Sequence, residues 1–372
     1  MTTDVGTEPV DETRAGLRIE RRGALAVVTL DRAGKLNAID DSMRKTLASA
    51  LPELARDINL YGLVIQAAPA RAFSAGGDLR ELYDQLLADP ASAEANLRRE
   101  YALIWDLECF PKPMVSLIDG AVMGSGVGLT LFGTHRVAGE AYSFRMPETA
   151  IGFFPDVGVA WTFAWLPHEI GIYLGLTGRA VGGADALRLG LATHCIGAGH
   201  HGAIQAAIAA ADTIDPVLDG LHRDPGAAPI DELAETIARC FSATTLAEIL
   251  ERLAAEHRHR EWCASVISEL KQRSPLALAV TLRHIREARE LDLRHTLIRD
   301  FRIACRLLVM SDFREAVRTT LIEKTGNPRW RPSEDWEVRC AMVDRVLAPM
   351  PGKELVLPTM QEMQAQRSEL QK

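Results

Sequence analysis

Two carboxylates lie eight residues apart in an otherwise apolar segment, Met146 to Gly158 (MPETAIGFFPDVG). Its prolines and glycines favour turns over one continuous helix. Apolar surroundings remove water from a carboxylate, which raises its pKa toward values useful for acid–base chemistry. Glu148 could equally begin a helix, and Asp156 is more simply read as the N-cap residue of the helix that follows. The residues alone therefore leave both roles open.

Two glycine-rich turns could supply backbone donors to the same site. They are Phe73 to Asp78 (FSAGGD), after the run GLVIQAA, and Gly120 to Gly128 (GAVMGSGVG), after MVSLI. Each is predicted as a strand followed by a turn that opens a helix, where free N–H groups point toward an anion or a developing oxyanion. Two such donors on a thioester oxygen would stabilise its charge, and one donor is typically worth about 3 kcal/mol of barrier. Either turn alone could need glycine for steric reasons only, and neither matches a dinucleotide- or phosphate-binding motif.

The elements that must position these groups follow from hydrophobic periodicity. Leu25 to Leu30, Leu63 to Gln66 and Met114 to Ile118 predict buried strands, with helical patterns over 41–58 and 93–108. This alternation indicates an α/β domain with largely parallel strands. Beyond about residue 168, helices are predicted over 203–212, 230–257, 259–291, 293–309 and 311–323, with a last one over about 334–347. We expect a disordered tail over 1–15, an α/β core over 16–200 and a helical region over 201–372.

Composition narrows the class of protein. With 372 residues, 47% of them apolar, the chain can bury a large core, and a net charge of −8 without a basic run argues against nucleic acid as a partner. No apolar run reaches the roughly 20 residues of a membrane span. Six scattered cysteines and no signal-like segment favour a cytoplasmic location. No metal site is expected, because His257, His259 and His284 are typical of a solvated helix face, and Trp161, Phe163 and Trp165 are expected in the core.

Taken together and in this order, the three segments resemble the crotonase (enoyl-CoA hydratase/isomerase) superfamily from about residue 17 to 348. The resemblance implies the ClpP/crotonase-like spiral of ββα units with a helical C-terminal region. It also implies an acyl-CoA substrate, no separate cofactor, and assembly as a trimer or dimer. Gly77 and Ser125 match the oxyanion N–H donors, although many relatives have glycine at the second. The substrate- or CoA-binding positions that this resemblance implies are Lys35, Leu36, Ala75, Gly76, Asp78 and Gly124, while Phe153 and Phe154 are expected to line the pocket because they adjoin the carboxylates.

Further segments resemble the 3-hydroxyisobutyryl-CoA hydrolase branch. Gly128 stands where hydratases carry a carboxylate, Glu148 matches their other glutamate, and Asp156 replaces their usual glycine. The run MPETAIGFFPDVG is similar to that branch, as are LGLTG, ALRLGLATH, SPLALAVTLR and DFREAVRTTLIEKTGNPRWRP. The branch implies hydrolysis of 3-hydroxyisobutyryl-CoA in valine degradation. Glu148 would attack the thioester carbon or activate water, and Asp156 would orient the substrate hydroxyl or relay a proton.

Two alternatives remain open from the sequence. Isomerisation of an enoyl-CoA can proceed on Glu148 alone, whereas Gly128 argues against hydration. A non-catalytic CoA-binding protein would bind CoA tightly and show no change of rate in Glu148→Gln. Basic residues of the C-terminal helices could meet CoA phosphates, although such a stripe is usually a solvated face; these are Arg314, Arg318, Lys324 and Arg329.

Overall fold

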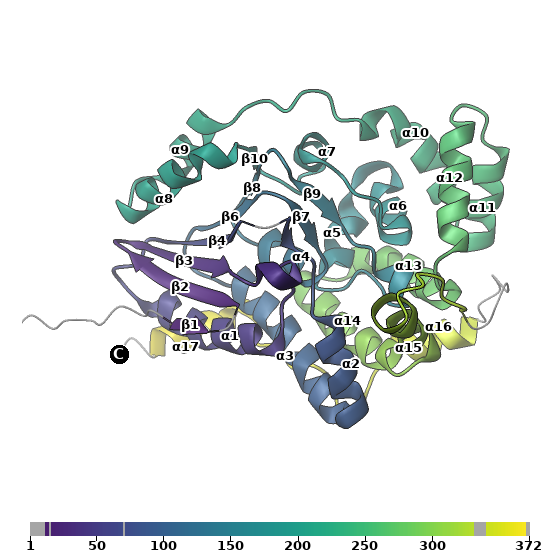
Figure 1. Ribbon diagram of the computed structural model, residues 1–372, viewed down its shortest axis with the longest axis horizontal. Coiled ribbons are helices and arrows are strands. Elements are labelled where there is room, and N and C mark those ends of the chain that lie inside the picture. The colour runs from purple at the N-terminus through teal and green to yellow at the C-terminus, as the bar shows by residue number, and fades with distance from the viewer. Residues whose placement is uncertain (1–11, 15, 70, 331–339, 370–372) are drawn as a thin grey trace, which may run out of the picture.

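The computed structural model describes residues 12–14, 16–69, 71–330 and 340–369 (Figure 1). It contains a seven-stranded sheet in the order β1-β2-β3-β4-β6-β8-β10 and a three-stranded sheet in the order β5-β7-β9. The strands are β1 Glu12–Arg14, β2 Leu17–Arg22, β3 Leu25–Leu30, β4 Gly62–Ala67, β5 Ala72–Ser74, β6 Met114–Ile118, β7 Ala121–Met123, β8 His135–Ala138, β9 Ser143–Arg145 and β10 His194–Cys195.

The larger sheet is buried on both faces. Every residue of β3 is buried, which explains why its sequence is continuously apolar instead of alternating. Leu25 and Val27 belong to a cluster with residues of α8 (His201–Ala209) and α9 (Ile214–Leu221). Ala26, Val28 and Leu30 belong to the cluster on the opposite face, which includes residues of α1 (Asp41–Arg56) and α3 (Pro90–Glu108). The sheet is thus the middle layer of three, as Figure 1 shows.

The predicted parallel arrangement is confirmed, with two antiparallel strands added at one edge. β3, β4, β6, β8 and β10 run parallel, whereas β1, β2 and β3 pair in antiparallel fashion. β1 occupies residues that we expected to lie in a disordered tail, and most of that predicted tail lies outside the described residues. The boundary predicted near residue 200 stays a prediction.

The smaller sheet carries both glycine-rich turns. β5 and β7 pair in parallel, and β7 pairs with β9. We expected the second turn to open a helix directly after β6. Instead, β7 lies between β6 and α4. The helices of this half are α2 Leu79–Ala88, α4 Ser125–Leu131, α5 Val159–Trp165, α6 Ile170–Thr177 and α7 Gly183–Arg188, with short 3₁₀ turns η1 Ala33–Lys35, η2 Glu148–Ile151 and η3 Pro167–Glu169.

The second half is helical, as predicted, but its helices are shorter than the periodicity suggested. The two longest predicted helices, 230–257 and 259–291, are each divided into two. The second helix of each pair begins at an N-cap side chain, Thr245 in the first case and Ser274 in the second. The pattern over 311–323 changes from an α-helix to a π-helix at Arg318, and the start predicted at 334 for the last helix lies outside the described residues. The helices are α10 Ile230–Phe241, α11 Leu246–Ala255, α12 Arg260–Lys271, α13 Pro275–Glu287, α14 Leu293–Leu308, α15 Ser311–Val317, α16 Cys340–Leu347 and α17 Met360–Glu369, with 3₁₀ turns η4 Ala198–His200 and η5 Ala288–Glu290 and the π-helix η6 Arg318–Ile322.

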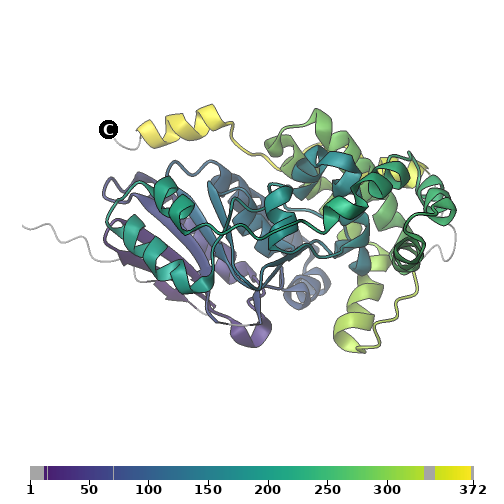
Figure 2. The same ribbon diagram turned by 90° about the horizontal axis from the view of Figure 1, so that it is seen from above.

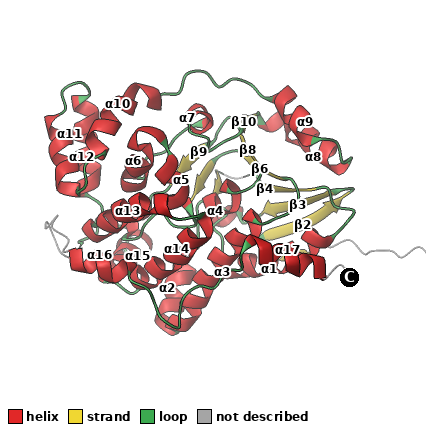
Figure 3. Cartoon of the chain, turned by 180° about the vertical axis from the view of Figure 1, so that it is seen from behind, coloured by secondary structure: helices red, strands yellow, loops and turns green. Residues whose placement is uncertain are grey.

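These C-terminal helices share the core of the α/β half. α14 packs against α3, and α13 packs against α6 and α5, within one continuous apolar cluster. Figures 2 and 3 show the sheets gathered at one end of the molecule and the helices packed around the other, while α17 returns toward the sheets. In the described part of the chain, no helix combines the length and apolar character needed to cross a membrane.

Two expectations about single side chains are wrong. His284 is buried and not part of a solvated face, because its imidazole pairs with a buried carboxylate, Asp300. Trp165, at the last turn of α5, is 64% exposed and does not belong to the core, whereas Phe163 is buried as expected.

Candidate active site

One cavity of about 210 Å³ brings together most of the residues singled out from the sequence. It lies between the two glycine-rich turns, helix α3 and the segment that holds both carboxylates. The predicted site residues that line it are Ala75, Gly76, Gly77, Asp78, Gly124, Ser125, Glu148, Phe153 and Asp156.

The parallel pairing of β5 with β7 brings the two turns together. Gly76, with a φ of +96°, passes so close to the second turn that an added Cβ would lie 3.3 Å from the Met123 carbonyl oxygen. A Cβ at Gly77 would lie 3.0 Å from Ser125 Oγ. Glycine is therefore needed at position 76, where two backbones approach each other closely, and at position 77 a side chain would crowd the Ser125 hydroxyl.

The two expected donors have free N–H groups. Gly77 precedes Asp78, the N-cap residue of α2, and Ser125 is the first residue of α4. Neither N–H has a hydrogen-bond acceptor within the part of the chain that the structure describes. Buried backbone N–H groups are nearly always paired. Two unpaired donors at one cavity are therefore available to an oxygen of a bound molecule.

Glu148 begins η2 and extends toward the second turn. A Cβ at Gly124 would lie 3.0 Å from Glu148 Oε1, and Oε2 has no hydrogen-bond partner among the described residues. Burial raises the pKa of Glu148 to about 8, and the Glu100 carboxylate adds to the shift. The expectation that apolar surroundings desolvate this carboxyl is confirmed.

Asp156 is not the side-chain cap of the following helix. Gly158 is the N-cap residue of α5, and the Asp156 carboxyl instead accepts a hydrogen bond of 2.8 Å from the Tyr101 hydroxyl on α3. Burial raises the pKa of Asp156 well above its usual value, and the Glu100 and Glu148 carboxylates raise it further. The cap interpretation was wrong because the turn at 157–158 directs this side chain into the cavity.

That turn has an unusual backbone conformation. Val157 has a φ of +54°, which is rare for a β-branched residue, and Gly158 has a φ of +80°. The Gly158 N–H donates to Asp300 Oδ2 at 2.7 Å, and His284 Nε2 lies 2.6 Å from the other oxygen of Asp300. Helices α13 and α14 thus hold the turn that presents Asp156.

Gly128 leaves no space for the carboxylate that the hydratases place at this position. A Cβ there would lie 2.6 Å from Ile104 Cδ1 and 2.9 Å from Val157 Cβ. Position 128 therefore supplies no carboxylate, and the cavity takes its acidic side chains from other segments, Asp156 among them.

Some predicted residues lie outside the cavity. Lys35 and Leu36 form an exposed turn beside the first glycine-rich loop, where the Ala75 N–H donates to the Leu36 carbonyl oxygen at 2.9 Å. Phe153 lines the cavity, but Phe154 does not, because it is fully buried against His284. Contact of Lys35 and Leu36 with CoA stays a prediction.

The sequence interpretation missed three polar residues that line the cavity. They are Arg44 on α1 and Asn96 and Glu100 on α3, and Arg44 donates to both of the others. A signal was present for Glu100, which occupies the apolar stripe formed by Leu97 and Ile104. A charge at a core-facing position of a helix is evidence of a buried pair or a site.

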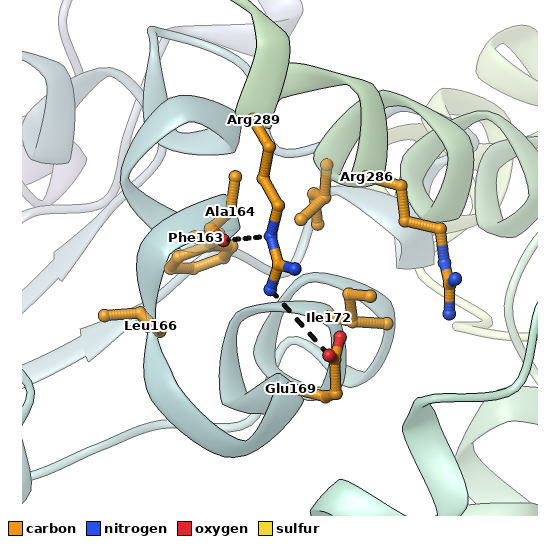
Figure 4. A pocket seen from close by; sticks show the side chains of 8 residues that line it. Phe163, Ala164, Leu166, Glu169, Ile172, Arg286 and Arg289 are labelled. Carbon is orange, nitrogen blue, oxygen red and sulfur yellow. Dashed lines mark hydrogen bonds and ion pairs between the residues drawn. The ribbon is translucent and has the colours of Figure 1, made fainter.

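A second hollow, of about 240 Å³, lies where α13 and the turn after it meet α5 and α6 (Figure 4). The Arg289 Nε donates to the Ala164 carbonyl oxygen at 2.7 Å, and its Nη2 lies 3.7 Å from Glu169. Arg286 donates to the carbonyl oxygens of Phe241 and Ala243. Both guanidinium groups thus bind carbonyls at the C-terminal ends of helices, which is a structural role.

No group of three or more metal-ligating side chains occurs among residues 12–14, 16–69, 71–330 and 340–369. The cavity therefore offers carboxylates, backbone N–H groups and one buried guanidinium as its reactive groups.

Comparison with known proteins agrees with this arrangement. The sequence matches the enoyl-CoA hydratase/isomerase family over residues 25–347. The chain belongs to this family. Among solved structures, a carnitinyl-CoA dehydratase from Mycobacterium thermoresistibile is 32% identical with a TM-score of 0.86, covering 92% of this chain and 99% of that one. An enoyl-CoA hydratase from Rhodobacter sphaeroides 2.4.1 is 34% identical with a TM-score of 0.86, covering 92% and 100%. The predicted crotonase fold is confirmed.

Curated proteins that are similar to this chain include hydrolases. A probable 3-hydroxyisobutyryl-CoA hydrolase 3 of Arabidopsis thaliana is 33% identical over 340 residues, covering 88% of this chain and 90% of the relative. The mitochondrial 3-hydroxyisobutyryl-CoA hydrolase of Rattus norvegicus is 34% identical over 330 residues, covering 86% and 85%. The corresponding Homo sapiens protein is 34% identical, covering 86% and 85%. These relatives match this chain over nearly their full length.

Proposed function

We propose that this protein hydrolyses 3-hydroxyisobutyryl-CoA to 3-hydroxyisobutyrate and CoA, a step of valine degradation. The observation that carries the proposal is the placement of two carboxylates, Glu148 and Asp156, in one cavity with two unpaired backbone donors. Closed packing at Gly128 disfavours the two-carboxylate arrangement of hydratases. The curated relatives that bear the hydrolase name support the acyl group.

The thioester carbonyl oxygen would lie between the N–H groups of Gly77 and Ser125. Attack on a thioester moves negative charge onto this oxygen, and two fixed donors in a site with little water stabilise that charge more than bulk water does. Ser125 has a side chain where many relatives have glycine, but its backbone N–H supplies the same donor.

Glu148 would act on the carbonyl carbon in its ionised form. Direct attack by a carboxylate oxygen would form a mixed anhydride and break the C–S bond, so that CoA leaves as a thiolate that takes up a proton. Water then opens the anhydride. In the other route Glu148 removes a proton from a water molecule that attacks the same carbon. Its raised pKa makes its carboxylate a stronger base than an exposed glutamate.

Asp156 would bind the substrate hydroxyl or pass a proton. The Tyr101 hydroxyl occupies one of its oxygens, Oδ2, which fixes the orientation of the carboxyl group. A cavity of about 210 Å³ suits a short acyl group. We therefore expect a short hydroxyacyl thioester to fit better than a long-chain one.

The decisive experiment is a panel of CoA thioesters assayed in two ways with the same enzyme preparation. Release of free thiol reports hydrolysis, and loss of enoyl absorbance reports hydration or isomerisation. We expect thiol release from 3-hydroxyisobutyryl-CoA by the wild type and none above background by Glu148→Gln. Enoyl turnover without thiol release would favour the isomerase alternative, and tight CoA binding with no turnover by either the wild type or Glu148→Gln would favour a non-catalytic CoA-binding protein.

The two hydrolytic routes differ in where an oxygen atom from water enters. Repeated turnover in ¹⁸O-labelled water would label the Glu148 carboxylate if an anhydride forms and water opens it at the Glu148 carbon. Mass spectrometry of the peptide that contains Glu148 measures this label. Label in the peptide would establish the anhydride route, whereas label in the product alone is expected both of the general-base route and of an anhydride that water opens at the acyl carbon.

Three further expectations belong to this proposal. The reaction as proposed requires no metal or separate cofactor, because the fixed donors and Glu148 perform both tasks. Assembly as a trimer or dimer, as the family resemblance implies, stays a prediction that light scattering can measure. The cytoplasmic location also stays a prediction, and the rat and human relatives are named as mitochondrial proteins.

A further inference from the structure

A buried cation lies next to both backbone donors. Arg44 is 4% exposed, and its Nη2 donates to Glu100 Oε1 at 2.9 Å and to Ser125 Oγ at 3.1 Å. The same nitrogen would lie 3.2 Å from a Cβ built on Gly77. One guanidinium nitrogen therefore binds the Ser125 hydroxyl and lies beside the space that a side chain at Gly77 would occupy.

Arg44 joins three helices at this point. It lies on α1, its Nη1 donates to Asn96 Oδ1 of α3 at 3.2 Å, and its Nη2 reaches Glu100 of α3 and Ser125 of α4. The planar guanidinium offers several donors in fixed directions, which a lysine ammonium group cannot reproduce. The start of α4 is thus bound to α1 and α3 through a rigid group.

The hydroxyl of Ser125 is the atom through which this contact is made. The backbone N–H of residue 125 would be present with any side chain, so the proposed chemistry does not itself need serine. The Ser125 Oγ accepts the hydrogen bond from Arg44. It lies so close to Gly77 that a Cβ built on Gly77 would be 3.0 Å away from it. The side chain and the backbone donor of Ser125 are therefore set in place together.

We propose that Arg44 is a positioning residue for the thioester reaction, which holds Ser125 by its hydroxyl so that the Ser125 and Gly77 N–H groups can reach one oxygen. This inference rests on the proposed function. Positioning matters because an oxyanion donor must point at the place where charge develops, and a small displacement weakens it. The Arg44–Glu100 pair would then contribute to the rate and not only to folding.

The competing explanation is that Arg44 only compensates the buried Glu100 carboxylate. A buried pair that loses one partner leaves an uncompensated charge, so removal of Arg44 would destabilise the fold in either case. A test must therefore remove the contact with Ser125 and leave the Arg44–Glu100 pair intact. Ser125→Ala does so, because it keeps the backbone N–H and removes only the hydroxyl.

The molecule contains a matched control far from the cavity. Arg179 donates to both oxygens of Glu269 at 2.8 Å and to Ser265 Oγ at 2.6 Å, which reproduces the arginine, glutamate and serine arrangement. None of these three residues lines the active-site cavity. Ser265→Ala and Arg179→Lys therefore report the cost of breaking a similar contact that has no part in the site.

The experiment measures kcat, KM and thermal unfolding for Ser125→Ala, Arg44→Lys, their double variant and the two control variants. We expect kcat to fall roughly tenfold in Ser125→Ala, less than the hundredfold or greater loss on complete removal of a donor, with KM nearly unchanged. Arg44→Lys should lower kcat at least as much. The double variant should be no slower than the slower single variant, because both changes break one contact. The control variants should keep the wild-type kcat.

Two outcomes would overturn the inference. One is a wild-type kcat in Ser125→Ala, whatever happens to its unfolding temperature. The other is a double variant whose loss equals the product of the two single losses, because Arg44 would then act independently of Ser125. The wild-type assay alone tests the hydrolase activity, and the variant ratios are taken on whichever thioester the wild type turns over. A wrong acyl group would thus contradict the proposed function without affecting the test of Arg44.

Discussion

Two hollows of this protein, the active-site cavity and the one between α13, α5 and α6, have nearly equal volumes of about 210 and 240 Å³ but opposite chemistry. In the active-site cavity, Glu148 Oε2 and the N–H groups of Gly77 and Ser125 have no partners among the described residues. In the other hollow, each guanidinium group is held by backbone carbonyls, and the buried Arg286 Nε has no acceptor within the described chain. Volume does not identify a site. Several polar groups that lack partners and converge on one cavity do so, because each unpaired group costs stability and their convergence indicates a bound molecule as the missing partner.

The largest effect expected from this difference is the loss of activity in Glu148→Gln. Removal of a general base or nucleophile should lower kcat by about 10² to 10⁴-fold. Stability should not fall, because burial disfavours the charged carboxyl and the amide carries no charge. Thiol release and thermal unfolding measure the two effects. A Glu148→Gln variant with lower stability and normal kcat would show that Glu148 has a structural role and would contradict its role in catalysis.

The next effect is a dependence on pH. Since Glu148 has a pKa of about 8 in the folded enzyme, its ionised fraction and hence kcat/KM should rise about tenfold per pH unit up to about pH 8 and then level off. The variant Asp156→Asn retains Glu148. Its kcat/KM should therefore show the same rise with pH up to about pH 8. A profile that is flat between pH 6 and about 8 would contradict ionised Glu148 as the reacting form.

The free energy of unfolding should also depend on the ionisation of Glu148, but it should fall as pH rises, whereas kcat/KM increases. The unfolded chain loses the Glu148 proton near its ordinary pKa of 4.5, whereas the folded protein retains it to about pH 8. The raised pKa of Glu148 therefore stabilises the folded state most below pH 4.5. This stabilisation is lost as the pH rises from 4.5 to about 8. The unfolding temperature of Glu148→Gln relative to the wild type should accordingly increase from pH 5 to 8. A constant difference would contradict the raised pKa.

A smaller effect is expected from Gly124→Ala. Gly124 has a φ of +46°, and the new methyl group would lie 3.0 Å from Glu148 Oε1. We expect a stability loss of about 1–3 kcal/mol from the backbone strain and a lower kcat, because Glu148 must move. Gly226→Ala is a control with a φ of +84° and no atoms near the added Cβ. It should lose stability and keep its kcat.

The smallest effect is expected at the second hollow. Arg289→Met removes the hydrogen bond to the Ala164 carbonyl oxygen, and should lower the free energy of unfolding by about 1 kcal/mol. The kcat should stay within about twofold of the wild type, because no reactive group lies there. Chemical denaturation and the thiol assay measure these values. A large loss of kcat with unchanged stability would show that Arg289 contributes to catalysis and would contradict its structural role.

The sequence predicted the fold well where the pattern had a local cause. Continuous apolar runs identified β3, β4 and β6, since each is covered on both faces. The divisions of the C-terminal helices at Thr245 and Ser274 were missed, because a capping side chain can interrupt a helix without disturbing its apolar period. Exposure of Trp165 and burial of His284 depended on neighbours that are distant in sequence.

The site was predicted in part. Both carboxylates and both glycine-rich turns were recognised from their own segments, and the structure brings them to one cavity. Arg44 and Glu100 were missed because a charged residue on an amphipathic helix usually faces solvent, and only the packing of α1 against α3 buries this pair. The role of Asp156 as a cap was wrong because the left-handed turn at Val157 could not be inferred from its sequence.

By itself the sequence determined which groups can react: a glutamate in apolar surroundings, and glycines where two backbones approach. It also determined the family, because those segments occur in a characteristic order. Only the tertiary structure decided that the Gly77 and Ser125 N–H groups stay unpaired at one cavity, and that Arg44 lies beside them. The physical reason is that hydrophobic periodicity reports which face of an element is buried, whereas the partner of a buried polar group is set by contacts between segments far apart in the chain.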